Sequence, residues 1–113
     1  MPRLLRRLVR NLLENARRHG AGRVLAALRL EAGTLVLTVD DEGPGVPQAQ
    51  RERIFEPFYR LPGATERDGG VGLGLALVRS IAERHGGQVR CVDSPGRGAR
   101  FEVRLPAATD AGV

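Results

Sequence analysis

The chain contains no lysine and no tryptophan, it has a single cysteine, and only four of its 113 residues are aromatic. The lone Cys91 excludes a disulfide within the chain and a thiolate cluster around a metal, so we expect a reducing compartment. Single-strand binders stack bases on aromatic rings, so we expect no nucleic-acid partner despite a net charge of +5. No apolar run approaches the ~18 residues of a membrane span, and no secretory signal opens the chain. Together these absences predict one cytoplasmic domain.

The first long segment, Arg3–His19, repeats its apolar residues at helical spacing and predicts an amphipathic helix. Most of its arginines fall opposite the leucines, on what we expect to be a solvated face. Four polar residues instead follow the border of the apolar face, where a side chain can face a pocket: Asn11, Asn15, Arg18 and His19. Asparagine is a mediocre helix former, so two asparagines one turn apart favour a functional role over an inert one.

A hairpin is predicted next, with strands over Arg23–Leu30 and Thr34–Val39. The hairpin leads into Asp40-Asp41-Glu42-Gly43-Pro44-Gly45, where carboxylates follow an apolar strand and glycines shape a turn. Acidic turns are common in proteins, so this motif alone leaves an inert turn and a binding site equally open.

The remaining segments complete the predicted elements. Proline at position 57 ends a short helix, and the two phenylalanines around it anchor the loop that follows. We expect a short helix over Pro47–Ile54, a mobile loop over 61–70, a second long helix over Leu73–Arg84, strands over Gln88–Asp93 and Ala99–Leu105, and a frayed tail from Pro106 onward.

Three alternating glycines run directly into the second long helix, in Gly70-Val71-Gly72-Leu73-Gly74-Leu75. Glycine lets backbone N–H groups approach an anion closely, and the first helical turn adds free donors and a positive dipole end. The spacing matches neither the dinucleotide nor the P-loop fingerprint, so on its own this phosphate-site hypothesis is weak.

In combination, these motifs are specific. The chain resembles the ATP-binding catalytic domain of bacterial sensor histidine kinases, in the GHKL superfamily with its Bergerat fold. The residues that carry the resemblance form four boxes: Asn11 to Ala16 (N box), Asp41 to Gly45 (first glycine box), Arg53 to Arg60 (F box) and Gly70 to Leu75 (second glycine box). One departure is Gly98-Ala99-Arg100-Phe101, where the family usually has a threonine after the first glycine.

The resemblance implies ATP and Mg²⁺ as cofactors and assigns roles to individual residues. Asn15 would bind Mg²⁺, with Asn11, Arg18 and His19 beside the phosphates, and Asn11, Asn15 and Arg18 would carry catalysis. Asp41 would accept the adenine amino group while Gly43 and Gly45 let the base approach the backbone. The other implied nucleotide-binding residues belong to the lid, which spans residues 60 to 70, and to the helix start: Arg60, Gly70, Gly72, Leu73, Gly74 and Leu75.

The fold implied is a two-layer α/β sandwich, with helices on one face of a mixed sheet. Residues 1–106 would form the ATP-binding domain and 107–113 a disordered tail. The family's domains ordinarily start earlier, so we expect an N-terminally truncated domain with an exposed sheet edge that could pair in a homodimer. The partners implied are a dimerisation and histidine-phosphotransfer domain and, indirectly, a response regulator, in the cytoplasmic part of a membrane-anchored sensor.

Two other functions compete with a kinase. GHKL ATPases of the gyrase, repair or chaperone type place a glutamate base four residues before the magnesium asparagine, whereas here that position is Asn11, which cannot accept a proton. The substitution favours the kinase. A noncatalytic ATP-binding regulator is the third hypothesis. Neither His19 nor His85 precedes an acidic residue as the phosphoacceptor does, so we expect the acceptor histidine elsewhere.

Overall fold

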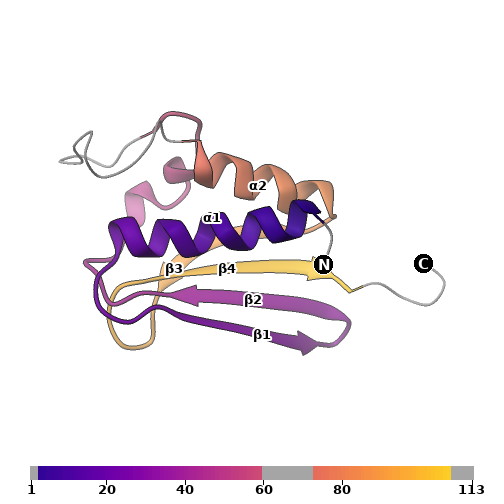
Figure 1. Ribbon diagram of the computed structural model, residues 1–113, viewed down its shortest axis with the longest axis horizontal. Coiled ribbons are helices and arrows are strands. Elements are labelled where there is room, and N and C mark those ends of the chain that lie inside the picture. Colours follow the sequence, from indigo (N-terminus) through magenta and orange to yellow (C-terminus); the bar gives the residue numbers. More distant parts are fainter. Residues whose placement is uncertain (1–2, 60–72, 108–113) are drawn as a thin grey trace.

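The computed structural model describes residues 3–59 and 73–107. Its elements are α1 (Arg3–His19), β1 (Leu25–Glu31), β2 (Thr34–Asp40), the 3-10 turns η1 (Gln48–Gln50) and η2 (Arg53–Phe55), α2 (Gly74–Arg84), β3 (Gln88–Asp93) and β4 (Ala99–Pro106). Figure 1 shows two layers, with α1 and α2 running in opposite directions across one face of the sheet. The predicted two-layer α/β sandwich is therefore confirmed.

The sheet has the order β1-β2-β4-β3. Every pairing among the described strands is antiparallel, so the expectation of a mixed sheet was wrong for this part of the chain. The helical connection through α2 does make β3 parallel to β2, as a crossover should. However, β4 turns back after β3 and inserts between the two strands, so the parallel pair is never hydrogen-bonded.

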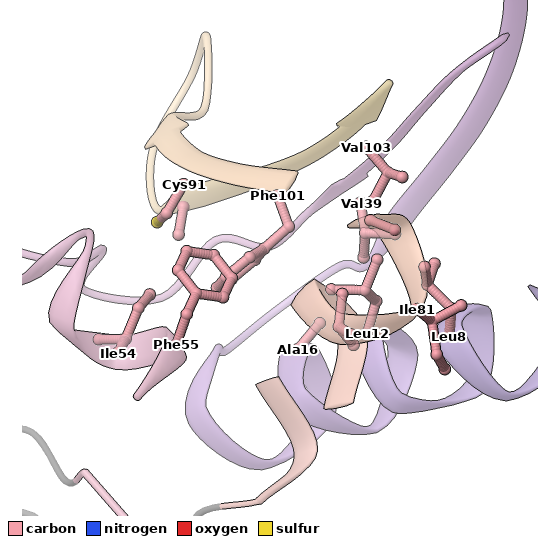
Figure 2. Packing of buried hydrophobic residues seen from close by; sticks show 13 residues of the cluster. Leu8, Leu12, Ala16, Val39, Ile54, Phe55, Ile81, Cys91, Phe101 and Val103 are labelled. Carbon is pink, nitrogen blue, oxygen red and sulfur yellow. The ribbon is translucent and has the colours of Figure 1, made fainter. Parts of the chain in front are cut away.

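The core lies between the helices and the inner face of the sheet (Figure 2). Leu8, Leu12 and Ala16 are four residues apart, so they share one face of α1, and all three are buried. They pack with residues of α2 and the sheet that are also almost fully buried: Val39, Val78, Ile81, Ala82, Phe101 and Val103. Burying each large side chain contributes about 1.5–3 kcal/mol, so this cluster is the main stabilising unit.

The segment between β2 and α2 is irregular where we predicted a short helix over Pro47–Ile54. It forms the two separate turns η1 and η2, with i to i+3 hydrogen bonds such as Gln50 N to Pro47 O (2.8 Å). The segment between the two prolines is too short for its helical hydrogen bonds to offset the free-energy cost of helix nucleation. Tertiary contacts therefore determine its conformation. Phe55 meets the Phe101 ring edge to face, with centroids 6.1 Å apart, as expected of an anchor. Phe58 was wrongly predicted as a second anchor, because this residue is 68% exposed.

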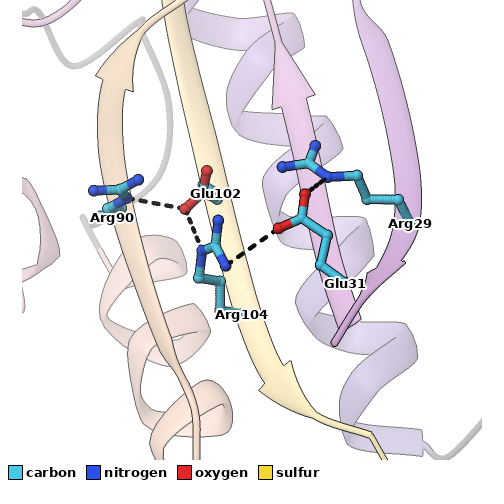
Figure 3. A network of polar contacts seen from close by, with 5 residues as sticks. All are labelled: Arg29, Glu31, Arg90, Glu102 and Arg104. Atoms are coloured by element: carbon cyan, nitrogen blue, oxygen red, sulfur yellow. Dashed lines mark hydrogen bonds and ion pairs between the residues drawn. The ribbon is translucent and has the colours of Figure 1, made fainter. Parts of the chain in front are cut away.

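The outer face of the sheet is covered by charged side chains (Figure 3). The carboxylate of Glu102 accepts hydrogen bonds from Arg90 Nε (3.0 Å) and Arg104 Nε (2.8 Å), and Glu31 pairs with Arg29 and Arg104. Burial alone would raise the pKa of Glu102, but the hydrogen bonds from Arg104 and Arg90 outweigh it and lower that pKa below its ordinary 4.5. This face therefore depends on ionised carboxylates.

Strand β1 forms one edge of the sheet, and the helices do not cover it. Leu28 and Leu30 alternate onto the helix side of β1, yet 64% of each is exposed. The exposed edge agrees with the sequence expectation. At the other end of the chain, Ala107, expected in the disordered tail, donates its N–H to Gly33 O (2.8 Å), while residues 108–113 lie outside the described part.

Candidate nucleotide site

Asp41 lies directly after β2, at the end of the molecule where α1 ends and β4 and α2 begin (Figure 1). Its side chain is buried, and its Oδ1 accepts hydrogen bonds from the backbone N–H of Gly43 (2.8 Å) and of Ala99 (3.3 Å). Its own N–H donates to Ala99 O (3.0 Å). The carboxylate is thus held at one oxygen by the turn after β2 and by the first residue of β4.

The neighbouring carboxylate has a different role. Asp40 points to the outer face of the sheet, where Arg100 donates to both of its oxygens through Nε (2.8 Å) and Nη2 (2.9 Å). This bidentate pair is a strong charge-assisted contact that joins β2 to β4. Of the two adjacent aspartates, only Asp41 turns away from an arginine and toward the interior.

Two glycines, Gly20 and Gly98, lie directly against Asp41, and Gly43 lies against Gly20. A Cβ added at Gly20 would lie 2.6 Å from Asp41 Cβ, a Cβ at Gly43 would lie 2.8 Å from the Gly20 Cα, and one at Gly98 would overlap the Asp41 carbonyl oxygen. Gly98 also has a φ of +93°, a conformation that favours glycine. No larger residue fits these positions without moving the carboxylate or its supports.

Glu42 fastens the end of α1 to this turn. Its N–H donates to Ala21 O (2.9 Å), and its Oε1 accepts the backbone N–H of Arg23 (2.6 Å). Helix α1 ends at His19, and the N–H of the next residue, Gly20, donates a hydrogen bond to Ala16 O (3.0 Å). The last turn of α1 is therefore fixed relative to Asp41.

The predicted residues of α1 lie on this helix as expected. Asn11 and Asn15 are half-buried on its border, while Arg18 and His19 are exposed in the last turn. Because α1 and α2 pack together in opposite directions, this end of α1 lies near the start of α2. Amide oxygens are suitable ligands for Mg²⁺ when phosphates supply the others, so the donor chemistry of Asn15 fits the ion. Among described residues, no three His, Cys, Asp or Glu side chains form a metal cluster.

Among the described residues, none covers the start of α2. Leu73 is 44% exposed and precedes the helix, Leu75 packs against the core, and a Cβ on Gly74 would meet nothing within 4 Å. The N–H groups of a first helical turn lack intrahelical partners, so this end suits an anion. Gly45, with a φ of +78°, lies beside Gly98 O, to which its added Cβ would come within 3.5 Å.

Some of the expected site lies beyond the described residues: Arg60, Gly70 and Gly72, together with the lid at 60–70. Conversely, sequence reasoning missed the supports of Asp41, namely Gly20, Gly98, the N–H of Ala99 and the side chain of Glu42. Gly98 and Ala99 are 57 and 58 positions from Asp41, and no local pattern signals such a contact. Only the resemblance drew attention to that turn, through the departure at Gly98-Ala99-Arg100-Phe101.

Residues 1–109 match the family of histidine kinase-, DNA gyrase B- and HSP90-like ATPases. The chain therefore belongs to this family. It is 47% identical over 105 residues to the sensor protein RstB of Escherichia coli, which covers 92% of this chain and 24% of RstB. Its fold is similar to the mycobacterial sensor histidine kinase MprB (TM-score 0.79, 34% identity, 91% of this chain and 70% of that one).

Full-length ShkA in complex with AMPPNP is also similar, with a TM-score of 0.78 and 35% identity over 91% of this chain and 21% of that chain. The chain thus spans about a quarter of the length of RstB and a fifth of ShkA. Among the residues that the structure describes, neither helix is both long and apolar enough to cross a bilayer.

Proposed function

We propose that this chain binds Mg-ATP as the catalytic domain of a sensor histidine kinase and donates the γ-phosphoryl group to a histidine outside residues 1–113. Family membership supports ATP binding, and ShkA was solved with AMPPNP. The observation that carries the proposal is Asp41. Because both described hydrogen bonds to its carboxylate use Oδ1, Oδ2 is left to accept the amino group of adenine. Guanine would present a carbonyl oxygen there and be rejected.

The phosphates would lie between the two helices' ends. The open first turn of α2 offers N–H donors at Leu73, Gly74 and Leu75, and Asn11, Arg18 and His19 would approach from α1. Asn15 would hold Mg²⁺, which supplies charge neutralisation between phosphate groups. Gly43 and Gly45 leave room for the base beside the backbone, and Arg60, Gly70 and Gly72 would complete the phosphate side.

Phosphoryl transfer then needs an in-line nucleophile. An imidazole nitrogen of the acceptor attacks the γ-phosphorus, the bond to the bridging oxygen breaks, and ADP leaves. The chain's own histidines are poorly suited to this role: His85 Nδ1 is 2.8 Å from Ile81 O within α2, and His19 is followed by the helix-ending Gly20. The acceptor would belong to a dimerisation domain that passes the group on to a response regulator.

A GHKL-type ATPase is the alternative. Asn11 occupies the position of its general base and cannot take a proton from water, and Glu14 is exposed on the outer side of α1. We therefore expect slow hydrolysis and no self-labelling by the isolated chain. Rapid hydrolysis that Glu14→Gln abolished would support the ATPase instead, and ATP binding without transfer to any added acceptor domain would support a noncatalytic regulator.

Calorimetric titration with ATP and GTP, with and without Mg²⁺, tests the proposal. Asp41→Asn should weaken ATP binding by about one to two decades, because a charge-assisted hydrogen bond contributes about 1.5–3 kcal/mol. Asp93→Asn is a matched control, since Asp93 is an exposed aspartate at the end of β3. Equal affinity for ATP and GTP in the parent chain would refute the assignment of Asp41.

The proposed setting is the cytoplasmic part of a membrane-anchored sensor. The β1 edge, with Leu28 and Leu30 exposed, would pair with another polypeptide strand, either from the same full-length protein or from a second copy in a homodimer. Sedimentation of the isolated chain distinguishes these cases, since only self-pairing makes its mass depend on concentration.

A further inference from the structure

The net charge of this protein resides on one helix. Helix α1 contains six arginines and one glutamate, whereas the rest of the chain has twelve arginines and twelve acidic residues and is neutral. Five of these arginines lie on the side of α1 turned away from the sheet, and all are exposed; we call Arg3, Arg6, Arg7, Arg10 and Arg17 the arginine row. A codon preference for arginine over lysine does not explain why the acidic residues avoid this helix.

The arginine row opposes the stability of its own helix. Arg3 is three and four residues from Arg6 and Arg7, and Arg10 is four and three residues from the same two, so like charges are neighbours on the helix surface. No acidic residue lies in the first turn, where the helix dipole favours negative charge. An opposing anionic surface would relieve both effects.

Several arginines of the sheet are paired, unlike those of the row. On the outer face of the sheet, Arg29, Arg90, Arg100 and Arg104 all contact carboxylates. In the part of the chain that the structure describes, Arg3, Arg7, Arg10 and Arg17 form no ion pair. Their guanidinium groups are therefore available to phosphate oxygens, which they can bind in bidentate fashion.

We propose that the arginine row docks α1 onto an anionic lipid bilayer. A protein partner would need an apolar or aromatic centre on this face, and Leu13, 38% exposed at its margin, is the only large exposed hydrophobic side chain of α1. The row extends from Arg3 to Arg17 and has no apolar centre, so it suits a fluid layer of charged headgroups, which adjust to any spacing. Docking through this face leaves Asn11 and Asn15, on the inner border, free for nucleotide.

Co-sedimentation with vesicles tests the proposal. The protein should bind vesicles of phosphatidylcholine with about a third phosphatidylglycerol, not pure phosphatidylcholine, and binding should fall steeply as salt rises from about 0.05 to 0.5 M. Each arginine near such a surface contributes about fivefold in affinity, so Arg3→Gln/Arg10→Gln/Arg17→Gln should bind about a hundredfold more weakly. The same variant should unfold at an equal or higher temperature, because like-charge repulsion is relieved.

A matched control removes the same charge elsewhere. Arg23→Gln/Arg84→Gln/Arg97→Gln replaces three exposed arginines outside α1 and should keep most of the binding. Equal losses in the two triple variants would show general charge attraction and overturn the proposal. An absence of binding to anionic vesicles would also overturn the proposal. Tighter binding to duplex DNA than to vesicles at the same salt would overturn it too, and would assign the arginine row to nucleic acid. None of these outcomes depends on ATP binding.

Discussion

Replacing Gly20 with alanine should damage the nucleotide site without substituting any of the residues proposed to bind nucleotide. The added Cβ would lie 2.5 Å from Ala16 O and 2.6 Å from both Cβ and Cγ of Asp41, where ordinary contacts begin at 3.4 Å. Either the end of α1 or the buried carboxylate must therefore move by about 0.8 Å. Overpacking of this kind costs about 1–3 kcal/mol, which corresponds to about 5–20 °C in unfolding temperature for a domain of this size.

Thermal unfolding by circular dichroism measures the stability loss, and calorimetry at a temperature where the variant is folded measures ATP affinity. We expect a loss of at least tenfold, because displacing Asp41 misaligns Oδ2 with the base. Gly96→Ala is the matched control, since its Cβ would meet nothing within 4 Å. A Gly20→Ala protein with parental unfolding temperature and parental ATP affinity would refute the steric account of Asp41.

Further changes test other parts of the structure. Gly74→Ala should leave stability equal or raise it by about 0.5–1 kcal/mol, yet weaken ATP binding if phosphates approach the first turn of α2; calorimetry that showed no loss would remove Gly74 from the site. Asn15→Asp should weaken Mg-ATP binding but not adenosine binding, and a variant with normal Mg-ATP affinity would move the metal role elsewhere. Glu102→Gln should lower the free energy of unfolding most above pH 4.5 and progressively less in acid. The lowered pKa of Glu102 means that its ionised carboxylate stabilises the fold, and this stabilisation is lost as the carboxylate is protonated. Denaturant titrations in which the two proteins differed by a constant free energy of unfolding across this pH range would contradict this. Burial raises the pKa of the Cys91 thiol from 9.0 to about 11, so alkylation at pH 9 should be slow until the protein unfolds, and rapid labelling of the folded chain would contradict the burial.

Local patterns in the sequence predicted the elements well. The leucine spacing of α1 predicted both of its ends, Arg3 and His19, and β3 was predicted with its observed bounds. The register between distant segments was not predictable. The parallel relation of β2 and β3 follows from the crossover helix, but nothing local indicates that β4 separates them, because strand order is decided by the packing of the whole sheet.

The candidate site also combines residues that local motifs indicated with residues that only distant contacts bring in. Asp41 and the asparagines became candidates because their short motifs occur together and resemble those of histidine kinases, and their roles at the nucleotide stay predictions. The glycines at 20 and 98 were not predicted as walls of the Asp41 pocket, because each is required by a steric contact with a residue far along the chain. Pro47–Ile54 failed as a helix for a related reason: contacts of Phe55 with Phe101 outweigh weak local propensity.

The central position of β4 constrains how this domain comes into being. The ribosome synthesises both of its partners, β2 and β3, before β4 itself, which is the last of the described elements. Until β4 is made, no described strand joins β2 to β3. A nascent chain halted before residue 99 would expose two strand edges and would also lack the backbone N–H that holds Asp41. Folding and acquisition of the nucleotide site should therefore coincide, in one late and cooperative event after synthesis of β4, at the slow rates typical of non-local sheets.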